Sequence, residues 1–144
     1  MFVELDHVGI VAHNWEEARE VLIERLGLVV DELRAPLPDG VWFAPEQTHN
    51  YFIKVGLGQT RIEVLIPEGT TSGTARFLAR NGPGLHHLGY ACNDVGEEAG
   101  RLEKNGMRRI DLGPEEAGRL RAAFFHPKSA NGILTELVPV YRER

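Results

Sequence analysis

The chain has 144 residues, of which 42% are hydrophobic and 26% charged, and its formal net charge is -5. This composition is typical of one ordinary globular domain and excludes a disordered chain or two independent domains. The acidic balance and scattered basic residues argue against nucleic acid as a partner, and no apolar run approaches membrane-spanning length. The N-terminus lacks signal-peptide features and the lone Cys92 cannot form an internal disulfide, so we expect a cytoplasmic protein.

The sequence contains an internal repeat, which organises the predicted fold. Residues 5–28, LDHVGIVAHNWEEAREVLIERLGL, resemble residues 85–107, LHHLGYACNDVGEEAGRLEKNGM. The ends of the two copies also agree, because TRIEVLIP at 60–67 resembles ILTELVP at 133–139. A copy of roughly 80 residues is too small to bury a good core alone. We therefore expect a single domain over 1–144, built from modules at about 1–68 and 83–144.

The first copy opens with an alternating, β-branched stretch that predicts a half-buried strand. Asn14 is a good N-cap, and acids follow it in the first helical turn. The helix should place four apolar residues on one face and stop at Gly27. These four residues are Ala18, Val21, Leu22 and Leu26. Further strands are expected at 29–33, 41–44, 50–56 and 60–66.

A short helix opened by Ser72 and closed by Gly82 is predicted between the copies. The second copy then repeats the strand and the helix, with Asp94 as the N-cap. Its remaining strands are expected near 107–112, 121–126 and 132–138. The pattern is a twofold βαβββ arrangement.

Two histidines and two glutamates stand at matching positions of the two repeats. The residues are His7, His87, Glu63 and Glu136. A single histidine or glutamate in a strand is ordinarily a core or surface group. Here the carboxylates lie on apolar faces, where an isolated charge is costly to bury. Two imidazoles and two carboxylates would satisfy one another through Co, Ni, Mn, Fe or Zn, and we favour this over a pair of buried ion pairs.

The other histidines have less specific interpretations. His86 adjoins His87 in a strand and should point to the opposite face. His13 is expected to be exposed, while His49 is expected in a polar loop. His126, in the HPKS turn, is either turn structure or a substrate contact. Cys92 is interpreted as a packing residue, and the acidic pair at 115–116 as a solvated loop.

Several segments resemble signature segments of methylmalonyl-CoA epimerases, which belong to the vicinal oxygen chelate (glyoxalase/bleomycin resistance) superfamily. The segments are LDHVGI, TRIEVLIP, TARFLARNG, GLHHLGY, FFHPKS and GILTELV. The resemblance implies an α+β fold in which two βαβββ modules form a cupped, eight-stranded mixed sheet around a metal ion. It also implies that the protein is a homodimer.

The resemblance assigns roles to individual residues. It makes His7, Glu63, His87 and Glu136 the ligands of a divalent metal ion, with Co expected, or Mn, Ni, Zn or Fe. It places Lys128 and Ser129 where these enzymes approach the thioester and coenzyme A of an acyl-CoA substrate.

The implied reaction is epimerisation at C2 of methylmalonyl-CoA or a related acyl-CoA, through an enolate that the metal stabilises. An acid or base is needed on each face of the planar enolate. Glu136 is the candidate for one face, and Glu46 or Glu63 for the other. Residues 38–50 and 113–121 depart from the family pattern, so the substrate need not be methylmalonyl-CoA or a CoA ester.

Three other functions within the superfamily are alternatives to epimerisation. A glyoxalase I-type lactoylglutathione lyase would use the same four ligands, with glutamates moving the proton. A resistance protein would sequester a ligand without a metal. A dioxygenase needs two histidines and one carboxylate, so Glu63 argues against it.

Overall fold

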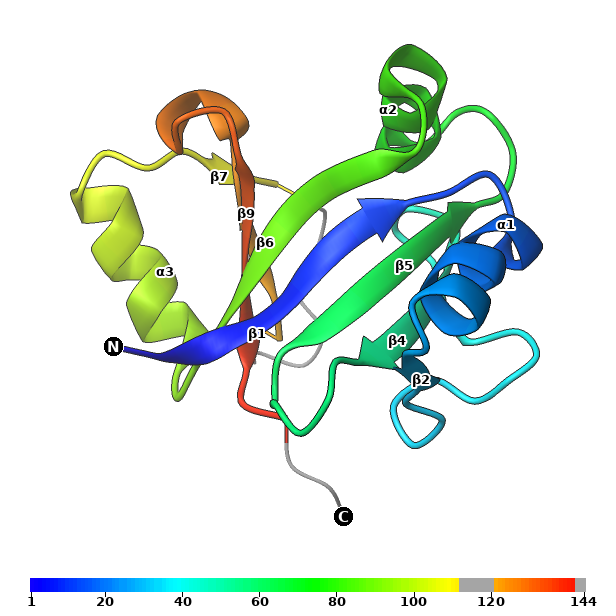
Figure 1. Ribbon diagram of the computed structural model, residues 1–144. Coiled ribbons are helices and arrows are strands. Elements are labelled where there is room, and N and C mark those ends of the chain that lie inside the picture. The colour runs from blue at the N-terminus through cyan, green and yellow to red at the C-terminus, as the bar shows by residue number, and fades with distance from the viewer. Residues whose placement is uncertain (112–120, 142–144) are drawn as a thin grey trace. The chain divides into compact units, whose positions relative to one another are not determined.

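The structure is a computed structural model that describes residues 1–111 and 121–141 (Figure 1). The segment 113–121, which departs from the family pattern, therefore lies almost entirely outside the described residues. The solvated loop predicted at Glu115 and Glu116 lies wholly outside them. The elements in chain order are β1 (Phe2–Val11), α1 (Trp15–Arg19), η1 (Glu20–Arg25), β2 (Val29–Val30), β3 (Val41–Phe43), β4 (Thr48–Lys54), β5 (Arg61–Pro67), α2 (Gly73–Asn81), β6 (Gly84–Cys92), α3 (Val95–Lys104), β7 (Arg109–Ile110), β8 (Ala123–Phe125), η2 (Pro127–Ser129) and β9 (Leu134–Pro139).

The nine strands found in the described residues are hydrogen-bonded in the order β2-β4-β5-β1-β6-β9-β8-β7, with β3 pairing β4. The sheet is mixed, because β6 and β9 run parallel whereas β8 and β9 run antiparallel. The α+β class and the mixed sheet are thus as predicted. Within the described residues, the sheet has one strand more than the eight predicted. The additional strand is β3, which has three residues and lies off the main order.

Contacts divide the chain into two compact units. Unit 1 comprises Met1–His7 and His87–Arg144, and unit 2 comprises Val8–His86. Both units contain part of β1 and part of β6. The organisation into a single domain, with modules at about 1–68 and 83–144, stays a prediction. Across the described residues, no helix is long and apolar enough to cross a membrane.

The core of unit 1 lies where α3 packs against β8 and β9. Asp94 caps this helix as predicted, since its side chain accepts a hydrogen bond from the Glu97 amide at 2.9 Å. Cys92 is fully buried in the core, as expected of a packing residue. The buried members of the cluster are Cys92, Val95, Ala99, Leu102, Ala123, Phe125 and Leu137. This core supports β9, which carries one of the candidate ligands.

In unit 2 the first helix begins as predicted but does not keep an α-helical period. Asn14 caps it, accepting from the Glu17 amide at 2.8 Å. From Glu20 the helix is a π-helix, and the Leu26 amide bonds to the Val21 carbonyl, five residues back. The wider turn displaces side chains from the 3.6-residue period. Val21 and Leu26 are therefore exposed, so placing them on the buried face was wrong, whereas Ala18 and Leu22 are buried.

The connecting helix α2 has the two ends that the sequence predicts. Ser72 accepts a hydrogen bond from the Ala75 amide at 3.0 Å, which satisfies one of the free N–H groups of the first turn. Gly82 ends the helix at a φ of 73°, a left-handed conformation that favours glycine.

His49 lies in β4 and not in a polar loop as predicted. Its ring nitrogens are 2.7 Å from a Glu68 carboxylate oxygen and 2.9 Å from the Asp39 carbonyl oxygen. Both partners are acceptors, so both nitrogens donate in the protonated form. The hydrogen bond to Glu68 is the largest cause of a raised His49 pKa. His49 therefore ties the segment before β3 to the end of β5. His13 is exposed, as expected.

A buried ion pair joins the end of β2 to β5 in unit 2. Arg61 Nε donates to Asp31 Oδ2 at 2.9 Å, and these residues are only 9% and 2% exposed. Arg61 Nη1 also donates to the carbonyls of Gly58 and Gln59. Burial alone would raise the Asp31 pKa, but the hydrogen bonds from Arg61 and the Arg34 amide, together with the positive charges of Arg61 and Lys54, outweigh it, and the pKa is lowered. The pair fixes the start of β5, the strand that carries Glu63.

Candidate metal centre

All four predicted ligands lie on strands, and their side chains are buried. His7 is on β1, His87 on β6, Glu136 on β9 and Glu63 on β5. In the parallel pairing of β6 with β9, His87 lies opposite Leu134 and Gly89 opposite Glu136. His7, His87 and Glu136 all belong to unit 1.

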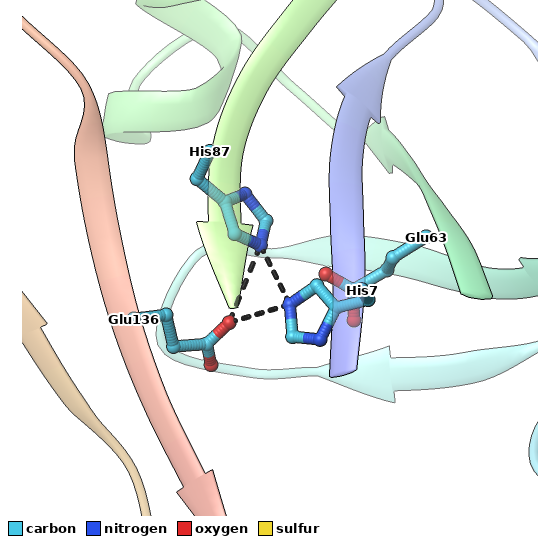
Figure 2. Close-up of side chains that lie close together, drawn as sticks. All are labelled: His7, Glu63, His87 and Glu136. Carbon is cyan, nitrogen blue, oxygen red and sulfur yellow. Dashed lines mark hydrogen bonds and ion pairs between the residues drawn. The ribbon is translucent and has the colours of Figure 1, made fainter. Parts of the chain in front are cut away.

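Each of the three ligand candidates of unit 1 places one side-chain atom close to one atom of each of the other two (Figure 2). His7 Nε2 is 2.9 Å from His87 Nε2 and 2.8 Å from Glu136 Oε1. His87 Nε2 is 3.2 Å from the same carboxylate oxygen. The residues are 2%, 5% and 9% exposed, so water can solvate these groups only slightly. The site is thus a compact triangle of two imidazole nitrogens and one carboxylate oxygen.

This triangle has the dimensions of a metal-binding site. Two donors that each lie about 2.1 Å from one cation, at an angle of about 90–110°, are about 3.0–3.4 Å apart. The three observed separations, 2.8, 2.9 and 3.2 Å, are close to this range. Imidazole nitrogen and carboxylate oxygen together suit borderline divalent metals. The described residues therefore fit a divalent cation, whose identity this donor set does not select.

Glu63 is the fourth candidate ligand. When one ligand atom is taken from each of the four residues, the atoms all lie within 4.8 Å of one another (Figure 2). Glu63 is 8% exposed, and within unit 2 it lies opposite Phe52 in the β4–β5 pairing. The four-residue cluster indicates a divalent metal site.

The electrostatics of the triangle favour an ionised Glu136. Burial opposes the charge and by itself would raise the pKa of this carboxyl group. The interactions of the carboxylate with His7 and His87, taken together, outweigh the burial and lower the Glu136 pKa to about 2. The carboxylate is therefore negative at neutral pH, the form required of a metal ligand and of a base.

Gly89 provides the space that the His7 ring occupies. A Cβ atom built at Gly89 would overlap the Cε1, Nε2 and Nδ1 atoms of the His7 imidazole. The absent side chain at Gly89 is thus part of the site, although glycine contributes no ligand. Gly89 stood in the sequence repeat, matched to Gly9, but that pattern gave no indication of this steric role.

The structure places Glu46 at the first turn of α2, within unit 2. Glu46 Oε2 lies 3.0 Å from the Thr74 amide nitrogen and 3.2 Å from Thr74 Oγ1, and accepts a hydrogen bond from each. Carboxylates are stabilising at this end of a helix. This contact gives Glu46 a structural role that the sequence did not predict.

We expect Glu46→Gln to lower the free energy of unfolding by about 1 kcal/mol, because the variant loses the negative charge beside the N-terminus of α2. Chemical denaturation of variant and wild type measures this difference. If Glu46 has only this structural role, folded Glu46→Gln should match wild type in any metal-dependent activity. A large loss of activity without a loss of stability would instead make Glu46 a catalytic base.

The two predicted coenzyme contacts lie in the short helix η2. The Ser129 hydroxyl accepts from the Arg108 amide at 2.9 Å and donates to the His126 carbonyl at 2.8 Å. His126 Nδ1 accepts from the Lys128 amide at 3.1 Å, so this histidine is part of the turn structure. The Lys128 side chain is exposed. The binding roles of Lys128 and Ser129 stay predictions.

Comparison with known proteins identifies the family. Residues 6–125 match the model of the Glyoxalase/Bleomycin resistance protein/Dioxygenase superfamily. The chain belongs to this superfamily. The prediction made from the repeat and the signature segments is thus confirmed at this level.

Several of the proteins to which the chain is similar are epimerases. The chain is 33% identical to the ethylmalonyl-CoA/methylmalonyl-CoA epimerase of Cereibacter sphaeroides over 97% of this chain and 100% of that protein. It is 32% identical to a mitochondrial methylmalonyl-CoA epimerase of Dictyostelium discoideum, over 93% of this chain and 76% of that protein. A Streptomyces coelicolor methylmalonyl-CoA epimerase, solved with 2-nitronate-propionyl-CoA, has a TM-score of 0.81 and 25% identity, covering 99% of this chain and 100% of that one.

Proposed function

We propose that the protein is a metal-dependent epimerase that inverts C2 of methylmalonyl-CoA or a closely related acyl-CoA. The observation that carries the proposal is the buried cluster of His7, Glu63, His87 and Glu136, whose ligand atoms lie within 4.8 Å of one another. Similarity to epimerases of ethylmalonyl-CoA and methylmalonyl-CoA supports the substrate class. The four cluster residues are the proposed metal ligands.

The proposed reaction is proton removal alpha to the thioester. The C2–H bond breaks, the proton passes to a carboxylate oxygen, and the electron pair enters the enolate. A bound divalent cation supplies Lewis-acid stabilisation of the developing negative charge. Glu136 suits the part of the base, because it is ionised at neutral pH and nearly enclosed by protein. Enclosure strengthens its electrostatic interactions by excluding water.

Inversion requires a second acid–base group, which donates its own proton to the opposite face of the enolate. We favour Glu63 over Glu46 for this part, because Glu63 belongs to the cluster whereas the Glu46 carboxylate accepts two hydrogen bonds from Thr74. Lys128 and Ser129 are proposed to contact the coenzyme A portion. Homodimer formation and a cytoplasmic location stay expectations.

The test is hydrogen exchange at C2. Purified protein, stripped of metal and then supplied with Co(II), is incubated with methylmalonyl-CoA in deuterated water, and C2 deuteration is followed by NMR. We expect exchange with loss of stereochemistry in the Co(II) sample and none in the metal-free control.

Exchange that is unaffected by metal removal would contradict the metal-dependent mechanism. Metal binding without exchange would reject this substrate, and lactoylglutathione formation from the methylglyoxal–glutathione adduct would then test the glyoxalase I-type reaction. If no divalent metal binds at all, the ligand-sequestering alternative gains support.

A further inference from the structure

A buried carboxylate stands directly behind the His7 ligand candidate. Asp6 Oδ2 lies 2.7 Å from His7 Nδ1, and the two residues are 3% and 2% exposed. Consecutive residues of a strand ordinarily direct their side chains to opposite faces. The Asp6 carboxylate nevertheless reaches the ring of its neighbour, so the contact does not follow from adjacency alone.

The two nitrogens of the His7 ring therefore have different surroundings. Nδ1 faces Asp6, whereas Nε2 faces His87 and Glu136. An ionised carboxylate has no proton to donate, so it accepts the Nδ1–H of the ring. When Nδ1 carries the proton, neutral histidine presents the lone pair of Nε2. This is the tautomer that can bind a cation within the triangle.

Asp6 and Gly89 together restrict the His7 ring. Asp6 holds the edge away from the cluster by a hydrogen bond, and Gly89 leaves the space that the ring fills. The second repeat differs at this point, because His86 matches Asp6 in the sequence. The His86 ring packs edge-on against Phe77 at a centroid distance of 4.8 Å. An acid before the ligand histidine is thus a feature of the first repeat alone.

We propose that Asp6 is a positioning residue that fixes His7 in its Nδ1–H tautomer and thereby raises the affinity of the cluster for a divalent cation. This inference rests on the metal site proposed above. Carboxylates that accept from the second nitrogen of a ligand histidine contribute about 10- to 100-fold to metal affinity.

The experiment compares Co(II) binding to metal-free wild type, Asp6→Asn and Glu98→Gln by isothermal titration calorimetry. Asp6→Asn keeps the shape of the side chain but removes its charge. Glu98 is a matched control, because it is another carboxylate of unit 1, 3% exposed, and pairs with Arg101 on α3. We expect Asp6→Asn to bind Co(II) about 10- to 100-fold more weakly, and Glu98→Gln to bind as wild type does.

A second measurement needs no variant. In Zn(II)-loaded wild type, nitrogen-15 NMR should show His7 bound through Nε2 and a slowly exchanging proton on Nδ1. Equal Co(II) affinity of Asp6→Asn and wild type, or His7 bound through Nδ1, would overturn the inference while leaving the metal site intact. Failure of wild type to bind either metal would overturn the metal site and this inference with it.

Discussion

The Glu136→Gln variant is expected to exchange the C2 proton of one methylmalonyl-CoA epimer, the one whose C2 proton faces Glu136, about 100- to 10,000-fold more slowly than wild type. The amide cannot accept a proton from carbon at neutral pH, whereas the Glu136 carboxylate is ionised there because its pKa is about 2. NMR measurement of C2 deuteration with Co(II)-loaded protein gives both rates. Metal content must be measured in parallel, since Glu136 is also a proposed ligand.

The Glu63→Gln variant is the matched control, because it changes the other cluster carboxylate while keeping an oxygen that can bind metal. If Glu136 and Glu63 serve opposite faces of the enolate, each variant should exchange one C2 epimer and neither should convert one epimer into the other. Wild-type exchange rates in metal-loaded Glu136→Gln would contradict the role of Glu136 as a base.

Replacement of Arg61 with methionine is expected to lower the free energy of unfolding by about 3–5 kcal/mol at neutral pH. The variant leaves the Asp31 carboxylate buried without its partner, at 2% exposure in the wild-type structure. Urea denaturation measures the difference. Arg19→Met is the control, because the Arg19–Glu24 pair at 2.7 Å is exposed and should contribute about 0–1 kcal/mol.

The effect of Arg61→Met should depend on pH in a defined direction. The pKa of Asp31 is lowered in the folded wild type from its ordinary value of 3.8. The pair therefore stabilises the fold above pH 3.8, and this contribution is lost as the pH falls through the lower folded pKa. The difference between wild type and variant should shrink in acid. If the difference in free energy of unfolding between wild type and Arg61→Met stays constant as the pH falls, the charge of Asp31 is not its cause.

The features predicted from the sequence were those whose causes are local or repeated. Asn14, Ser72 and Asp94 cap helices because each side chain reaches an amide three residues ahead. The ligand candidates His87 and Glu136 were found because the repeat placed them at the same points as His7 and Glu63. In both cases the information lies within a short window or in the comparison of two such windows.

The features that the sequence did not predict depend on contacts between distant segments or on a changed helical period. Glu46 contacts Thr74, 28 residues away, and Gly89 makes room for His7. The π-helix exposes Val21, which an ideal α-helix would bury with Ala18 and Leu22. Periodicity assumes a constant number of residues per turn, so it fails where the turn widens.

Because Gly89 has no Cβ atom, the residues that are tolerated at positions 89 and 7 should depend on each other. A substitution at Gly89 first collides with the His7 imidazole, so its cost depends on the residue at position 7. While residue 7 is histidine, a side chain at position 89 would overlap its ring. Within this superfamily the pair is therefore expected to show epistasis. A scan of single substitutions would score Gly89 as essential, although it neither binds a metal nor takes part in the reaction.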